Sequence, residues 1–331
     1  MTTTTTVALV VLATTDRLRR ADRELLVLAG TLGETHVVVP DAPGDALLGE
    51  LAAHGVGTVH APEGGPGDRL TTPAVALAEA AARETGATAL LLAATPEAKD
   101  VAARLGVRLG AGVVTDVVAL DADLVATKSV LAGGWTTRCR ATSPVLIATV
   151  RPNSVELPAH PAAHAAGGTP GAGPAGAQRP RMRTHALEDT VPAARVVGRS
   201  ALPASGRPAL GEARVVVAGG RGTGGDFEPL EALADVLGGA VGASRAAVDA
   251  GWIGPEAQVG QTGRTVSPQL YVSCGISGAV QQRAGMQTAG TIVAVNKDEQ
   301  APVFEIADLG IVGDLQKVLP QAVEHLRALR G

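Results

Sequence analysis

The chain has 331 residues, a formal net charge of −4, and 46% hydrophobic, 18% charged and 2% aromatic residues. This length predicts about two domains, and the composition predicts packed cores rather than disorder. Scattered acids and bases exclude a basic nucleic-acid-binding surface, and the scarcity of aromatic residues excludes a stacking platform for single strands. Two cysteines are too few for a disulfide framework, so we expect the cytoplasm, or the interior of an organelle if a targeting peptide has been removed.

The first half of the chain alternates short apolar runs with helical patterns. This rhythm predicts a mostly parallel sheet with helices on both faces, followed by a β-like stretch that we interpret as a meander at the sheet edge. No apolar run approaches the ~18 residues of a membrane-spanning helix, so we expect no direct membrane insertion. The predicted strands cover residues 7–13, 36–39, 58–60 and 87–92, the helices 16–29, 73–85 and 97–106, and the meander 113–118 and 145–150.

A segment rich in Pro, Gly and Ala, residues 157–194, interrupts this pattern and shows no periodicity. We predict a flexible linker there, between an N-terminal α/β domain over 1–156 and a C-terminal domain over 195–331. His160 and His164 lie four residues apart in it, but nothing nearby supplies a third ligand, so we predict no metal site. The first half shows no catalytic constellation, and we predict no catalytic residues.

The α/β rhythm resumes after the linker. The fold class is therefore predicted as two doubly wound, mostly parallel α/β domains joined by a Pro/Gly/Ala-rich linker. In the second domain the predicted strands cover 214–218, 240–243, 270–273 and 291–296, and the helices 227–237, 278–285 and 315–329.

A glycine cluster follows the first strand of the second domain. Residues 220–225 satisfy G-x-G-x-x-G, a pattern that lets the backbone approach a phosphate at the start of a helix. The acidic residue of an NAD site, expected ~20 positions later, is missing, and Ser244 and Arg245 stand in its place. An NAD site is therefore disfavoured, whereas an NADP-binding oxidoreductase domain stays possible.

Two further segments carry polar groups beside flexible backbone. Gln258, Gln261 and Thr262 could either hydrogen-bond a planar heterocycle or form an ordinary polar turn. A strand ending at Cys274 runs through residues 275–278 into a predicted helix, which indicates an anion site with Ser277 as helix cap and phosphate ligand. Cys274 itself is interpreted as a small packing residue.

This last segment resembles the signature of electron-transfer flavoprotein α subunits. The resemblance covers essentially all of 210–331, and in the first half it is weaker and rests chiefly on layout and on residues 103–106 and 149–152. The residues that carry it are Gly219–Gly222, Val241–Gly251, Gln258–Gly263, Leu270–Tyr271, Gly275–Gly278, Gln281, Gly285, Thr291–Asn296, Ala301–Phe304 and Gly313–Leu315.

The resemblance implies that the C-terminal domain holds one FAD. A fixed guanidinium such as Arg245 would favour a reduced, anionic flavin. The family usually has His where this chain has Gln282, so we predict weaker stabilisation of a one-electron-reduced flavin. Carried onto this chain, the ring would lie by Arg221, Ser244, Arg245, Val259, Gly260, Gln261 and Thr262, the pyrophosphate and ribityl chain by Ser277, Gly278, Ala279, Val280, Gln281 and Gln282, and the adenosine end by Asn296, Asp314 and Leu315.

The resemblance also implies an electron carrier rather than an enzyme. It would work as a heterodimer with a β subunit that holds AMP or a second FAD. Its expected donors are flavoprotein dehydrogenases of the acyl-CoA type in fatty acid β-oxidation, and its expected acceptor is a membrane quinone oxidoreductase. A flavin-bifurcating version that uses NADH is the alternative within the family.

Overall fold

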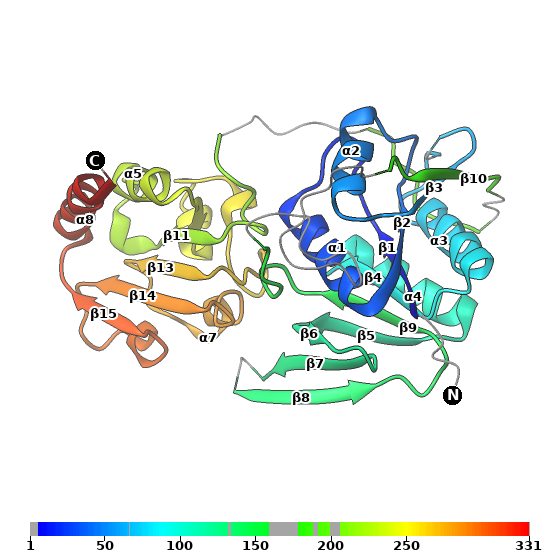
Figure 1. Ribbon diagram of the computed structural model, residues 1–331. Coiled ribbons are helices and arrows are strands. Elements are labelled where there is room, and N and C mark those ends of the chain that lie inside the picture. The colour runs from blue at the N-terminus through cyan, green and yellow to red at the C-terminus, as the bar shows by residue number, and fades with distance from the viewer. Residues whose placement is uncertain are drawn as a thin grey trace. The chain divides into compact units, whose positions relative to one another are not determined.

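The computed structural model describes residues 6–65, 67–131, 134–158, 178–187, 191–198 and 206–330. The chain divides into two compact units, residues 1–129 with 136–201 and residues 130–135 with 202–331. Each unit has its own parallel sheet, as Figure 1 shows. Each unit also has its own hydrophobic cores. The expected α/β fold with two domains is confirmed.

The first unit is built on a seven-stranded parallel sheet of order β10-β3-β2-β1-β4-β9-β5. Its strands are β1 (Thr6–Val11), β2 (Gly33–Val38), β3 (Thr58–Pro62), β4 (Ala89–Ala93), β5 (Gly112–Val117), β9 (Leu146–Val150) and β10 (Arg181–His185), and its helices are α1 (Arg20–Leu32), α2 (Asp45–Ala53), α3 (Thr72–Thr85) and α4 (Pro96–Leu109).

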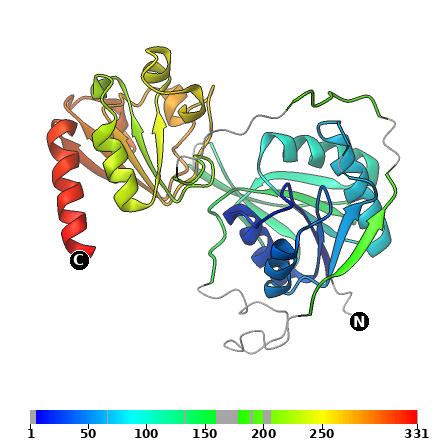
Figure 2. The same cartoon turned by 90° about the horizontal axis from the view of Figure 1, so that it is seen from above.

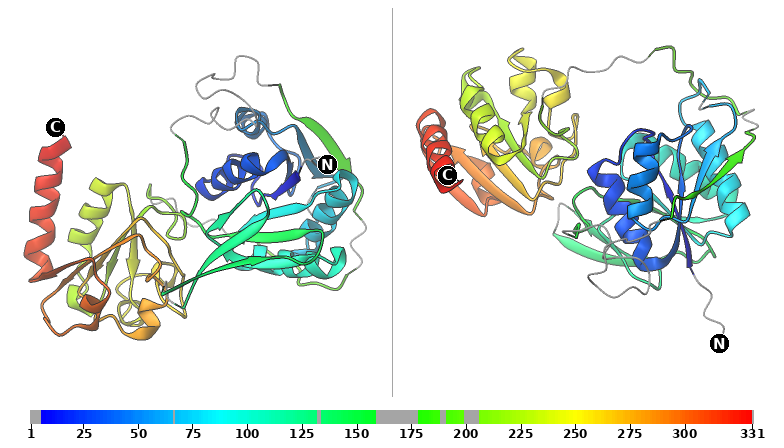
Figure 3. Two further views of the ribbon diagram at one scale, coloured as in Figure 1. Left: turned by 60° about the horizontal axis from the view of Figure 1, so that its bottom comes forward. Right: turned by 45° about the horizontal axis from the view of Figure 1, so that its top comes forward.

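The helices cover both faces of this sheet because successive strand residues point to opposite sides. Ala8 and Val10 of β1 pack with α1 and α2, whereas Leu9 and Val11 pack with α3 and α4. Figure 3 shows the helices on both sides of this sheet. Helix α4 follows Thr95, whose Oγ1 accepts the Ala98 N–H at 3.1 Å. Of these helices, the sequence pattern missed α2.

The expected meander differs from the structure. Strands β5 and β9 are parallel partners in the main sheet, with β5 at its edge and β9 between β4 and β5. Every residue of β9 is buried, as is usual for an inner strand of a parallel sheet. The separate three-stranded sheet is instead made by residues between them, in β6 (Ala119–Leu120), β7 (Val125–Val130) and β8 (Trp135–Arg140).

Residues 181–185 also differ from the linker predicted there. They form β10, which pairs in parallel with β3 at the edge of the sheet, with Met182 opposite Val59. The sequence of β10 is polar and mostly exposed, so no apolar pattern indicated a strand. His160 and His164 lie outside the described residues.

The second unit is built on a five-stranded parallel sheet of order β12-β11-β13-β14-β15. Helices α5 and α8 lie side by side on one face, as Figure 2 shows. Within the described ranges, no helix is both long and apolar enough to cross a membrane. The strands are β11 (Val215–Gly219), β12 (Ala240–Ala243), β13 (Leu270–Cys274), β14 (Thr291–Asn296) and β15 (Leu309–Val312), and the helices are α5 (Glu228–Leu237), α6 (Arg245–Asp249), α7 (Val280–Arg283) and α8 (Leu315–Arg330).

Candidate functional site

The candidate site lies where the strand order of the second unit reverses. The chain moves from β11 outward to β12, then returns to place β13 on the other side of β11. Ligands of open α/β sheets bind beyond the carboxyl ends of the strands at such a point. The two strands end level with each other, because Gly219 pairs with Cys274. The loops that follow β11 and β13 therefore start side by side.

The two loops interlock through glycines. The N–H of Gly220 donates to the Cys274 carbonyl at 2.9 Å, and the N–H of Gly222 donates to the Gly275 carbonyl at 3.0 Å. A Cβ on Gly220 would lie 2.4 Å from the Gly275 oxygen, and one on Gly222 would lie 2.6 Å from the Gly275 Cα. The glycine cluster is thus needed for backbone packing between loops, whatever ligand it also approaches.

The turn after β13 leads into a helix much shorter than the one predicted over 278–285. Helix α7 has four residues, and its N-cap is Ala279 without a side-chain hydrogen bond. The expectation that Ser277 caps a helix was therefore wrong. Ser277 is exposed, and its carbonyl accepts the Val303 N–H at 3.0 Å.

The backbone of this turn nevertheless offers donors. Within the described part of the chain, the N–H groups of Ser277, Gly278 and Ala279 donate to no protein acceptor. Gly278 has a φ of +82°, which favours glycine, and a Cβ there would lie 2.5 Å from the Val303 nitrogen. Successive free N–H groups of this kind form a concave anion site. The turn itself, rather than a helix dipole, fits a phosphate group.

These loops surround a cavity of about 610 Å³, within the range of small-molecule and cofactor sites. Most residues predicted to hold the flavin line it, and those that line it are Arg221, Ser244, Arg245, Val259, Gly260, Gln261, Thr262, Ser277, Ala279, Gln281, Gln282 and Asn296. Lining residues that were not in the predicted set are Gly222, Ala246, Asp249, Gln258, Gly275, Ile276, Asp298 and Ala301.

Gly278, Val280, Asp314 and Leu315 are the predicted residues that do not line the cavity. Leu315 is 3% exposed and packs in the core behind it. Asp314 accepts the Gln316 N–H at 3.1 Å at the start of α8, and this hydrogen bond lowers the pKa of its carboxyl group. Contacts of Asp314 and Leu315 with the adenosine end of a flavin stay a prediction.

Two side chains that were predicted to contact the flavin already form hydrogen bonds within the protein. Ser244 is the N-cap of α6, and its Oγ accepts the Ala247 N–H at 3.4 Å. Asn296 donates from Nδ2 to the Ile276 carbonyl at 2.9 Å and so holds the turn after β13 in place. Both side chains therefore shape the cavity wall.

Two of the charged side chains that line the cavity, Arg245 and Asp249, belong to α6. Arg245 begins this helix, and its side chain is 69% exposed. Its Nε donates to Asp249 Oδ2 at 3.2 Å, one helical turn later. The spacing of four on a helix was the sequence signal that could have identified Asp249. Each of these side chains can change the electrostatic potential that a bound ligand meets.

Gln282 lines the cavity and has one buried acceptor without a hydrogen-bond partner among the described residues. Its side chain is 8% exposed, and Nε2 donates to the hydroxyl of the fully buried Tyr271 at 3.0 Å. Oε1 is buried and accepts no hydrogen bond in the described part of the chain. An orphaned buried acceptor carries a free-energy penalty that a ligand donor would remove. A flavin, with its ring N–H and ribityl hydroxyl donors, fits this requirement.

Cys274 is fully buried next to the site. Burial raises the pKa of its thiol to about 12, so the thiolate does not form at neutral pH. The expected packing role is confirmed.

Comparison with known proteins matches both units. A family model described as the electron transfer flavoprotein FAD-binding domain matches residues 209–287, and one described as the electron transfer flavoprotein domain matches residues 8–188. The α subunit of electron transfer flavoprotein from Mycobacterium leprae is 44% identical over 319 residues, covering 95% of this chain and 96% of that protein.

Two further relatives carry the same name. The subunit from Mycobacterium tuberculosis strain H37Rv is 45% identical over 95% of this chain and 96% of its own length. The mitochondrial subunit from Dictyostelium discoideum is 57% identical over 125 residues, covering 37% of this chain and 35% of its own. The chain belongs to the electron transfer flavoprotein α-subunit family.

Proposed function

We propose that this chain binds one FAD in the cavity of its second unit and carries electrons between protein partners. The observation that supports this most strongly is the interlocked pair of glycine loops at the strand-order reversal, because both loops line the cavity and the second one continues into the free amides of residues 277–279. As a member of its family, the chain is a subunit of a redox carrier rather than an enzyme.

FAD would supply the redox chemistry when bound. The turn at 277–279 would direct its N–H groups to the pyrophosphate. Gln282 Oε1 would accept a hydrogen bond from the ligand, and Gln261 and Thr262 would meet the ring edge. The guanidinium of Arg245 would favour negative charge on the ring, and Asp249 would moderate that effect.

We further propose a heterodimer with a β subunit that holds AMP. The relatives are named as α subunits, which supports a partner of this kind. The donors would be flavoprotein dehydrogenases of the acyl-CoA type in fatty acid β-oxidation, and the acceptor a membrane quinone oxidoreductase. The low cysteine content supports a cytoplasmic location.

The test is stepwise anaerobic reduction of the chain co-expressed with its β-type subunit, followed by absorption spectroscopy. One FAD per heterodimer, reduced in two separate one-electron steps, would support the proposal. Two FADs and direct reduction by NADH would replace it with the bifurcating version. A folded complex that binds NADP but no flavin would refute it.

A further inference from the structure

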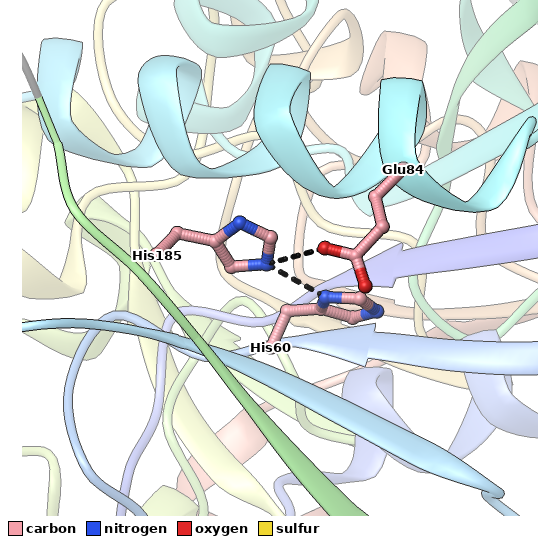
Figure 4. Close-up of side chains that lie close together, drawn as sticks. All are labelled: His60, Glu84 and His185. Carbon is pink, nitrogen blue, oxygen red and sulfur yellow. Dashed lines mark hydrogen bonds and ion pairs between the residues drawn. The ribbon is translucent and has the colours of Figure 1, made fainter.

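Three histidines from neighbouring strands of the first unit form a row. His36 Nδ1 lies 3.2 Å from His60 Nε2, and His60 Nδ1 lies 2.9 Å from His185 Nε2. A carboxylate stands at each end: Glu34 Oε1 is 3.0 Å from His36 Nε2, and Glu84 Oε2 is 3.8 Å from His185 Nε2. His60, in the middle, is fully buried. Figure 4 shows Glu84 reaching from α3 towards His60 and His185.

The carboxylate of Glu34 fixes the proton order along the row. An ionised carboxylate can only accept, so a neutral His36 donates from Nε2 and keeps a lone pair on Nδ1. His60 must then donate from Nε2 to His36, which leaves the lone pair of His60 on Nδ1. That lone pair faces His185 and Glu84. A histidine held from behind in this way is typical of metal ligands, whose second ring nitrogen donates to an outer partner.

We propose that His60 Nδ1, His185 Nε2 and one carboxylate oxygen of Glu84 bind a divalent transition metal ion of the Zn²⁺ class. The three ligand atoms all lie within 4.8 Å of one another. Metal–ligand bonds of about 2.0–2.1 Å in a tetrahedron require ligand separations of about 3.3 Å. Two of the three separations, 2.9 Å and 3.8 Å, bracket this value and the third is at most 4.8 Å, so side-chain rotations that draw the ligands together complete the site.

The donor set selects the class of metal. Two imidazoles with one carboxylate suit Zn²⁺, whereas Ca²⁺ and Mg²⁺ prefer oxygen ligands throughout. The Glu84 side chain is 46% exposed, so water can reach the fourth position. Arg183 lies 3.6 Å from Glu84 Oε1, the oxygen that does not face His185, so this pairing leaves Oε2 available. Metal binding requires the proton on His185 Nε2 to move to Nδ1.

The sequence did not indicate this site, because the ligands come from β3, α3 and β10 and have no motif spacing. The histidine pair with a regular spacing, His160 and His164, lies elsewhere in the chain, and no metal site was predicted. A bound ion would join β10 to β3 and to α3. It would thereby fix the strand that lies within the predicted linker segment onto the first unit.

The test is isothermal titration of Zn²⁺ into the tag-free full-length chain after chelator treatment. We expect one ion per chain and a rise in melting temperature. His185→Gln and Glu84→Gln should each weaken binding at least about 100-fold, because each removes a direct ligand and outer partners alone contribute about 10–100-fold. Glu84 is half-exposed, so its variant is expected to fold.

Two variants show whether the ion occupies this site and whether the histidine row supports it. The double variant His160→Gln/His164→Gln should bind Zn²⁺ as tightly as the unaltered chain. Glu34→Leu should weaken binding about tenfold, because it removes the acceptor that fixes the histidine row. Loss of binding in the 160/164 variant with retention in His185→Gln would overturn the proposal, as would the absence of stoichiometric binding to the unaltered chain.

Discussion

The hydrogen bond between Gln282 and Tyr271 leads to a prediction about two properties of the chain, its stability and its affinity for FAD. Variants of these two residues should change the two properties independently. Tyr271→Phe removes a fully buried hydroxyl and leaves the Gln282 Nε2 group without its acceptor. A buried donor left unpaired costs about 1–3 kcal/mol. Adding Gln282→Leu removes that donor and also the orphaned Oε1. Replacing both partners by apolar groups is close to neutral, so the double variant should regain most of the lost stability.

The affinity for FAD should not follow the stability of these variants. Tyr271→Phe leaves Gln282 Oε1 in place, so FAD should still bind to this variant. Gln282→Leu, alone or combined with Tyr271→Phe, removes the acceptor and should weaken FAD binding about tenfold, the equivalent of one hydrogen bond of about 1.4 kcal/mol.

Urea unfolding of the deflavinated chain measures its stability, and quenching of flavin fluorescence measures its affinity for FAD. Gln281→Leu is the matched control, because Gln281 lines the same cavity but is exposed, and its unfolding free energy should change by less than about 0.5 kcal/mol. Additive destabilisation in the double variant would refute the coupling. Normal FAD affinity in the double variant would refute the ligand role of Oε1.

Three further predictions concern other parts of the structure. Gly278→Ala should destabilise the second unit by about 2–4 kcal/mol and abolish FAD binding, because its φ is +82° and the Cβ would overlap Val303; normal flavin content would contradict this. Arg245→Gln should lower the flavin midpoint potential and Asp249→Asn should raise it, with both shifts smaller at high salt. Spectroelectrochemistry measures these potentials, and shifts of equal sign in the two variants would contradict the reasoning. Burial, followed by the charges of nearby His185, His36 and Arg183, lowers the pKa of His60 from 6.5 to about 4. The folded state therefore disfavours the protonated form of His60, and roughly 3 kcal/mol of stability should be lost as the pH falls from about 6.5 to 4. Melting curves recorded in EDTA over this pH range should show a smaller loss of stability for His60→Gln than for the unaltered chain.

Local sequence patterns predicted the parts of the structure that depend on local interactions. The glycine turn at 275–278 and the strands that flank it follow from residues close together in the chain. The Gln282–Tyr271 bond and the interlock of Gly222 with Gly275 depend on how loops dock, so their roles could not be deduced from spacing. Strand β10 has no apolar alternation and forms only because β3 offers an open edge.

The interlocked glycine loops have a consequence for how the flavin site assembles. Gly220 and Gly222 belong to the segment after β11, and Gly275 to the segment after β13, with β12 and α6 between them. Neither segment can present a flavin pocket alone, because each forms one wall of it. A fragment that ends before β13 should bind no flavin. Cofactor uptake should consequently coincide with cooperative folding of the whole second unit, and excess flavin should raise the yield of refolded chain by mass action.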